Sequence, residues 1–140
     1  MIKPGQIFVF GSNTAGIHGA GAAREAVIKH GAVMGVGEGR TGNAYALPSK
    51  DQRLKTLPLH TVNYYVDTFC QHASDNLDTV FYVTRIGCGL AGFQDFQIAP
   101  MFNKVPSNCI LPIEWKVYLP PNVTAQLTFH FWDDDQRANR

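Results

Sequence analysis

The chain has 140 residues, of which 45% are hydrophobic and 16% are charged, a composition typical of globular proteins and not of disordered ones. Its formal net charge of +1 argues against a broad electrostatic surface for nucleic acid or for an anionic membrane. No apolar run approaches the ~20 residues that a membrane-spanning helix needs. The length suffices for one compact domain with a buried core.

Cysteine usage and the first residues predict a compartment. The three cysteines, Cys70, Cys88 and Cys109, are an odd number and lack the spacing of a metal site, so we expect reduced thiols. The first residues, MIKPGQ, run almost directly into an apolar segment, which is not the pattern of a secretory signal. We therefore expect a cytoplasmic protein with no membrane partner, no metal and no cofactor.

The first predicted elements are a buried strand and a helix. Residues 7–10, IFVF, are consecutive apolar residues that end at a glycine, a pattern that favours a fully buried strand. Helical spacing begins near Gly19 and ends before Gly31, because a glycine can close a helix there. Residues 31–48 are rich in glycine and predict a loop, either a mobile lid or an ordered wall of a pocket, with a short strand at 44–47.

A long amphipathic helix follows this loop. Pro58 suits a first helical turn, and apolar residues then recur every three or four positions, at Leu59, Val62, Val66, Phe69 and Ala73. Further strands are predicted at residues 79–84, 108–112 and 125–132. Strands that alternate with helices predict an α/β fold. We find no repeat and no linker, and so expect a single domain over residues 1–140.

The segment GSNTAGIHGAGAAREA, residues 11–26, follows the first strand and leads into the first helix. A helix N-terminus offers free N–H groups and about half a positive charge, and glycines let a phosphate approach the backbone closely. The segment lacks the Gly-Lys-Ser/Thr ending of a P-loop, and Arg24 stands where the dinucleotide fingerprint has its third glycine. Taken alone, it fits either a phosphate-binding turn or tight packing of a helix against a sheet.

A second glycine-rich segment, RIGCGLAGF at residues 85–93, also follows a predicted strand. Ligands of open α/β sheets bind beyond the carboxyl ends of the strands, so the two segments could face each other across one cleft. Its glycines would present backbone donors, and Leu90 and Phe93 would give the cleft apolar walls. Cys88 stands between two glycines, and we expect a small buried thiol there rather than a nucleophile.

These two segments resemble the paired loops of the macrodomain superfamily, whose members bind ADP-ribose and often hydrolyse its conjugates. The string VTRIGCGLAGF is the more specific match, and Asn13 stands at the asparagine position of the family's first loop. The resemblance covers about residues 6–115 and leaves residues 116–140 as a C-terminal extension. The chain also resembles small macrodomain-like proteins of phages and bacteria. It implies a mixed β-sheet flanked by helices in three α/β/α layers, with the loops around the diphosphate and Asn13 near the distal ribose.

A third segment, AYALPSKD at residues 44–51, is similar to the strand of macrodomains that remove ADP-ribose from proteins or DNA through a lysine. Lys50 stands at that position, and the resemblance implies a catalytic role at the anomeric carbon. The alternatives are a counter-charge for phosphate or a solvated lysine. Two features depart from the family pattern: Ala91 replaces an aspartate found in some hydrolases, and the segment that contacts adenine is not expected in this chain.

The ligand is expected to contact both glycine-rich loops. The expected residues are Gly11, Ser12, Asn13, Thr14, His18, Gly19, Ala20 and Gly21 in the first loop, and Ile86, Gly87, Cys88, Gly89, Leu90, Ala91, Gly92 and Phe93 in the second.

Three functions are compatible with these residues. The first is binding of ADP-ribose or a related nucleotide, with possible sequestration of a signalling molecule. The second is hydrolysis of ADP-ribose from protein or DNA through Lys50. The third is a protein-interaction domain with degenerate loops and no affinity for nucleotides.

Overall fold

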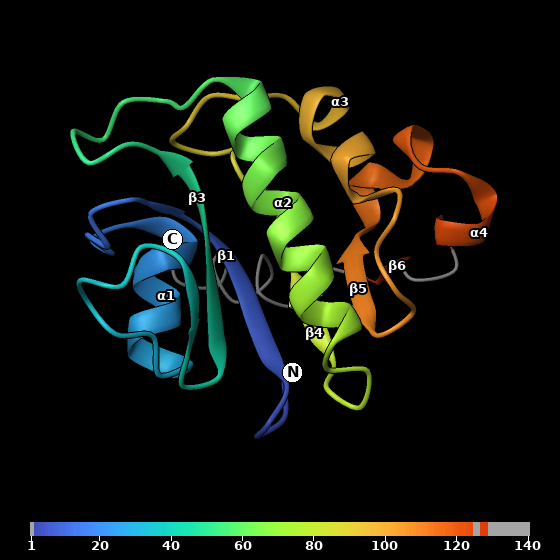
Figure 1. Cartoon of the computed structure of the whole chain (residues 1–140), viewed down its shortest axis with the longest axis horizontal. Helices are drawn as coiled ribbons and strands as arrows, with labels where there is room; N and C mark the ends of the chain where they lie inside the picture. Colours follow the sequence, from blue (N-terminus) through green and yellow to red (C-terminus); the bar gives the residue numbers. More distant parts are fainter. Residues whose placement is uncertain (1, 125–126, 129–140) are drawn as a thin grey trace.

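Six strands form one sheet in the computed structural model, which describes residues 2–124 and 127–128. Their order across the sheet is β2-β3-β1-β4-β5-β6 (Figure 1). The strands are β1 (Ile7–Asn13), β2 (Gly39–Thr41), β3 (Ala44–Lys50), β4 (Phe81–Val83), β5 (Cys109–Pro112) and β6 (Leu127–Thr128).

The sheet is mixed, because one antiparallel pair of strands adds to four parallel pairs. The two-residue turn of Gly42 and Asn43 joins β2 to β3 as a hairpin, and the pairs β3–β1, β1–β4, β4–β5 and β5–β6 are parallel. Parallel strands need crossover connections, and the long helices of residues 21–29 and 59–74 lie in the connections from β1 to β3 and from β3 to β4. The predicted α/β class with a mixed sheet is confirmed.

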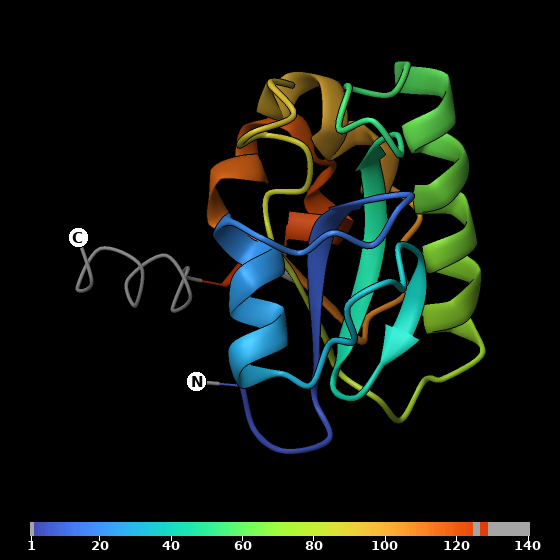
Figure 2. The ribbon, with the colours of Figure 1, turned by 90° about the vertical axis from the view of Figure 1, so that its left-hand side faces the viewer.

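Helices cover both faces of the sheet, as Figure 2 shows in side view. Helix α1 (Gly21–Lys29) lies on one face, where it packs over Phe8 and Phe10. Helix α2 (Leu59–Ser74) lies on the other, with Ile7 and Val9 in the core beneath it. The apolar run of β1 is therefore buried on both faces, as its lack of alternation predicts, and the three layers are those expected.

Short helices follow β4 and β5. They are α3 (Asp95–Ile98), the 3-10 helix η1 (Ala99–Phe102), the 3-10 helix η2 (Ile113–Tyr118) and α4 (Pro121–Thr124). Helix η1 packs on the α2 side of the sheet through Phe102, which shares a core with Phe69 and Trp115. The strand predicted at 125–132 lies mostly outside the described residues, which include only β6 of it.

The glycine-rich segment before β2 braces the turn after β1. The N–H of Gly35 donates to the carbonyl of Gly16 at 2.8 Å, and the Ser12 hydroxyl donates to the carbonyl of Gly37. A Cβ at Gly37 would overlap the backbone of Asn13 and Thr14. This close approach explains why glycine stands at residue 37 and makes the segment an ordered support for the first loop.

We predict that Gly37→Ala lowers the free energy of unfolding by about 2 kcal/mol, because the added methyl group meets backbone atoms that cannot rotate away. Urea denaturation measures the change. The control is Gly19→Ala, where a Cβ has nothing within 4 Å, and its effect is expected to stay within about 0.5 kcal/mol. Equal stability of the two variants would contradict the packing at Gly37.

Candidate functional site

A cavity of about 460 Å³ opens at the carboxyl ends of β1, β3 and β4. The chain leaves β1 for α1 on one face of the sheet, whereas it leaves β4 for α3 and η1 on the opposite face. Neighbouring parallel strands whose connections diverge in this way leave a crevice between them, which is where open α/β sheets bind ligands. The volume lies in the range of small-molecule sites, roughly 300–1,000 Å³.

Most of the residues expected to bind a ligand line this one cavity. They are Gly11, Ser12 and Asn13, which belong to the end of β1 and not to a loop, Gly19, Ala20 and Gly21 at the start of α1, Ile86, Gly87, Cys88, Gly89, Leu90 and Ala91 from the second loop, and Lys50 from the end of β3. The fold therefore brings together three segments that are far apart in the sequence. Their contact with a ligand stays a prediction.

Thr14, His18, Gly92 and Phe93 are not among the lining residues. Thr14 is exposed, with its hydroxyl 3.5 Å from the side-chain oxygen of Gln52. His18 is buried behind the turn, where its Nε2 lies 3.0 Å from the carbonyl oxygen of Val36. Phe93 packs against the α2-side core. Thus His18 and Phe93 support the loops from behind.

The first wall of the cavity is the turn from β1 into α1. Ala20 is the N-cap of α1, no side chain caps the helix, and no acidic residue lies in its first turn, so its first N–H groups face the cavity without a side-chain acceptor. The Asn13 amide donates to the carbonyl of Ile17 at 2.7 Å and accepts from the Ile17 N–H at 3.0 Å. Asn13 thereby closes the turn that presents the helix N-terminus.

The second wall is the loop after β4, where backbone hydrogen bonds fold residues 85–93 tightly. Gly87 has a φ of +75°, and its carbonyl accepts from the Phe93 N–H at 2.9 Å. In residues 2–124, the N–H groups of Gly89, Leu90 and Ala91 have no protein acceptor. These donors remain available to an anion in the cavity.

Arg85, which also lines the cavity, anchors this loop through its guanidinium. Its guanidinium donates to both oxygens of Asp95, at 3.1 and 2.7 Å, and Trp115 Nε1 donates to the same carboxylate at 2.9 Å. Burial alone would raise the pKa of Asp95, but the hydrogen bonds from Arg85 and Trp115 outweigh it and the pKa lies below its ordinary value. Asp95 does not line the cavity.

Cys88 is half-buried, and its thiol lies 3.5 Å from the carbonyl oxygen of Ile86. Burial, together with the nearby Asp95 charge, raises its pKa to about 12. The thiol is therefore protonated at neutral pH, in line with the expectation that it is not a nucleophile.

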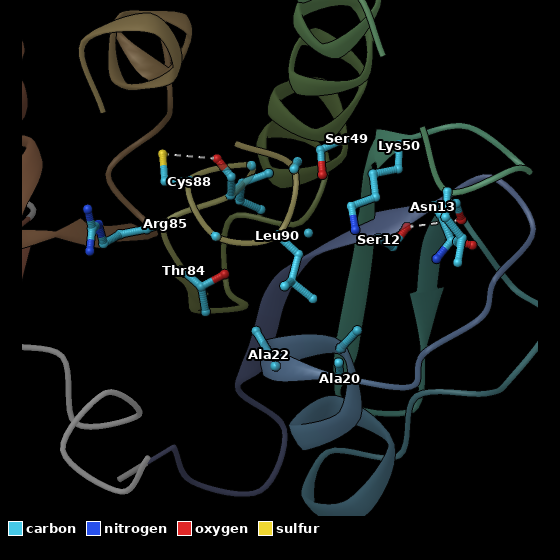
Figure 3. A pocket seen from close by; sticks show the side chains of 18 of the residues that line it. Ser12, Asn13, Ala20, Ala22, Ser49, Lys50, Thr84, Arg85, Cys88 and Leu90 are labelled. Carbon is cyan, nitrogen blue, oxygen red and sulfur yellow. Dashed lines mark hydrogen bonds between the residues drawn. The ribbon is translucent and has the colours of Figure 1, made fainter. Parts of the chain in front are cut away.

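Lys50 brings positive charge to the cavity. Figure 3 shows its side chain reaching into the space between the two loops, whereas Arg85 points away from that space. In the described part of the chain, Lys50 forms no ion pair. Neither aspartate, glutamate nor histidine occurs among the lining residues that the structure describes. The cavity can attract an anion, but it offers no carboxylate or imidazole for proton transfer.

Several lining residues were missed by sequence reasoning: Ile17, Ala22, Ala23, Ser49, Leu54, Thr84 and Arg85. Ser49 lies within AYALPSKD and Thr84 within VTRIGCGLAGF, and their position at predicted strand ends was the signal that could have found them. The Ser49 hydroxyl, drawn in Figure 3, has no hydrogen-bond partner within the described residues. Leu54 lies in a polar turn and had no signal of its own.

Comparisons of the chain with models of protein families, with curated proteins and with solved structures gave no match. Among residues 2–124 and 127–128, no helix has the length and apolar character needed to cross a membrane. The same residues contain no cluster of His, Cys, Asp and Glu that could hold a metal ion.

We predict that Asp95→Asn lowers the free energy of unfolding by about 2 kcal/mol at neutral pH, because the hydrogen bonds from Arg85 lose their charged acceptor and one of its two oxygens. A carboxylate with a lowered pKa stabilises the fold above its unfolded pKa, and this contribution disappears as the pH falls through its folded pKa. Urea unfolding of both proteins between neutral pH and about pH 2.5 measures this. The difference between wild type and variant should shrink in acid; a constant difference would contradict the ion pair.

Proposed function

We propose that the protein binds ADP-ribose, or a related ADP-ribose-derived nucleotide, in the cavity between the two glycine-rich loops. The observation that carries the proposal is the convergence of the α1 N-terminus, the open N–H groups of the second loop and Lys50 on one cavity. The resemblance of both loops to those of macrodomains supports the choice of ligand.

A diphosphate suits this arrangement electrostatically. The N-terminus of a helix carries about half a positive charge and favours an anion. Lys50 adds a full charge that no described carboxylate neutralises, and a cation on a phosphate forms a charge-assisted hydrogen bond. Ser49, Ala20 and Ala22 have small side chains, which leave room for a ribose beside the diphosphate.

Binding without chemistry is the favoured form of this function. Hydrolysis of a glycosidic bond needs groups that donate and accept protons, and the described lining residues include no carboxylate and no histidine. A protein of this kind would act by holding the nucleotide, and so by lowering the concentration of a signalling molecule.

Calorimetric titration with ADP-ribose tests the proposal. Gly19→Val and Gly89→Val place a side chain where a Cβ has nothing within 4 Å, so the fold should persist while backbone approach is blocked and the affinity falls by about a hundredfold or more. Ser107→Val, an exposed position before β5, is the control and should bind as wild type does. No heat with ADP-ribose or its derivatives would leave the interaction-domain hypothesis instead.

Hydrolysis through Lys50 is the second candidate, and the placement of this side chain within the cavity favours it. We predict that Lys50→Ala weakens ADP-ribose binding by about tenfold to a hundredfold, because a charged hydrogen bond to phosphate is lost. Incubation with ADP-ribosylated protein and DNA then separates the two functions. Binding with no release of ADP-ribose is expected, and release that disappears in Lys50→Ala would establish the hydrolase.

A further inference from the structure

Ser49 carries a buried hydroxyl that has no partner in the described part of the protein. The residue is 4% exposed and lines the cavity at the end of β3, and its Oγ forms no hydrogen bond with the described residues. Figure 3 shows the hydroxyl turned toward the space between the two loops. A buried polar group without a partner is unfavourable for the fold, so this hydroxyl indicates a partner that comes from outside the protein.

The backbone of Ser49 is fixed. The strand pairs with β1 on either side of this residue, and the Ser49 carbonyl accepts from the Leu57 N–H at 2.9 Å. A short side chain on a fixed strand has little freedom to lose, so its hydroxyl can hydrogen-bond to a ligand at a low cost in entropy.

A second group without a protein partner lies beside the same point. A Cβ on Gly11 would stand 3.4 Å from the backbone nitrogen of Gly87 and 3.5 Å from the Ser49 Oγ. The N–H of Gly87 has no protein acceptor in residues 2–124, and all three residues line the cavity. Because residue 11 is a glycine, a space remains there between β1 and the second loop, bordered by two groups that can hydrogen-bond. We name this space the Gly11 gap.

We propose that the Gly11 gap binds a ribose hydroxyl of the nucleotide and that Ser49 is the residue that selects for it; this rests on the proposed nucleotide function. A sugar hydroxyl can accept from the Gly87 N–H, and it can donate to or accept from the Ser49 Oγ. Both protein groups are neutral, and burying an ionised phosphate oxygen beside neutral groups costs more than burying a hydroxyl. Ser49 therefore distinguishes a ligand that carries a sugar from a bare diphosphate.

Calorimetric titration of the full chain with ADP-ribose and with inorganic pyrophosphate tests the proposal. Ser49→Ala should lower the affinity for ADP-ribose by about tenfold, because one hydrogen bond is lost, and leave the affinity for pyrophosphate within about twofold. Its urea midpoint should be equal or higher, because the hydroxyl has no described protein partner to lose. Ser107→Ala, at an exposed serine before β5, is the matched control.

Gly11→Ala tests the gap from the opposite side. The added methyl group would have its nearest neighbours at 3.4, 3.5 and 3.8 Å, so the fold should tolerate it while the gap is filled. The affinity for ADP-ribose should fall by about tenfold or more. The double variant with Ser49→Ala should lose no more than Gly11→Ala alone, because both changes remove the same contact.

The nucleotide contains two riboses, and titration of smaller ligands identifies the one that enters the gap. If the loss in Ser49→Ala recurs with ADP, the hydroxyl belongs to the ribose that carries the base. If it recurs with ribose 5-phosphate, the hydroxyl belongs to the terminal ribose.

Three results would overturn the Gly11 gap and leave the nucleotide function standing. They are unchanged affinity of Ser49→Ala for ADP-ribose, an equal loss for pyrophosphate, which would make a phosphate oxygen the bound atom, and additive losses in the double variant. Wild type that binds neither ADP-ribose nor its derivatives would overturn both proposals.

Discussion

The pairing of β1 with β3 on one side and with β4 on the other is the constraint on which the rest of the structure depends. Both pairs are parallel, and β1 is buried on both faces. Parallel pairing brings the carboxyl ends of three strands to one edge of the sheet, and the diverging connections to α1 and α3 leave a crevice there. Two loops separated by more than sixty residues in the chain therefore enclose one cavity.

Much of the polar chemistry near this cavity holds the two glycine-rich loops in place. Asn13 closes the first turn, and Arg85 is held by Asp95 beside the second. The segment of residues 31–38 braces the first turn from behind. Because these groups are engaged with one another, the backbone donors are positioned before any ligand arrives, which reduces the cost of ordering a site on binding.

The described lining of the cavity carries positive charge and contains no aspartate, glutamate or histidine. Lys50 gives the cavity a positive charge, while the Cys88 thiol stays protonated because burial raises its pKa. A site with a cation and open N–H groups is electrostatically suited to an anion. The lining of the cavity includes exposed apolar side chains, Ile17, Leu54 and Leu90, besides the buried polar residues at the strand ends.

The sequence by itself determined the buried central strand, the α/β class and the two loops, because continuous apolar runs, helical periodicity and glycine clusters are local patterns. It also placed Lys50 beside them. Only the tertiary structure decided which loop residues face the cavity. His18 lies behind its turn because its ring bonds to the distant Val36 carbonyl, and the Arg85 guanidinium donates to Asp95, whose carboxylate also accepts from Trp115. Leu54 lines the cavity because it lies in a turn in which Asp51 accepts from the Arg53 N–H and the Thr56 hydroxyl donates to the Ala91 carbonyl. Such roles depend on contacts between residues far apart in the chain, and local patterns do not carry them.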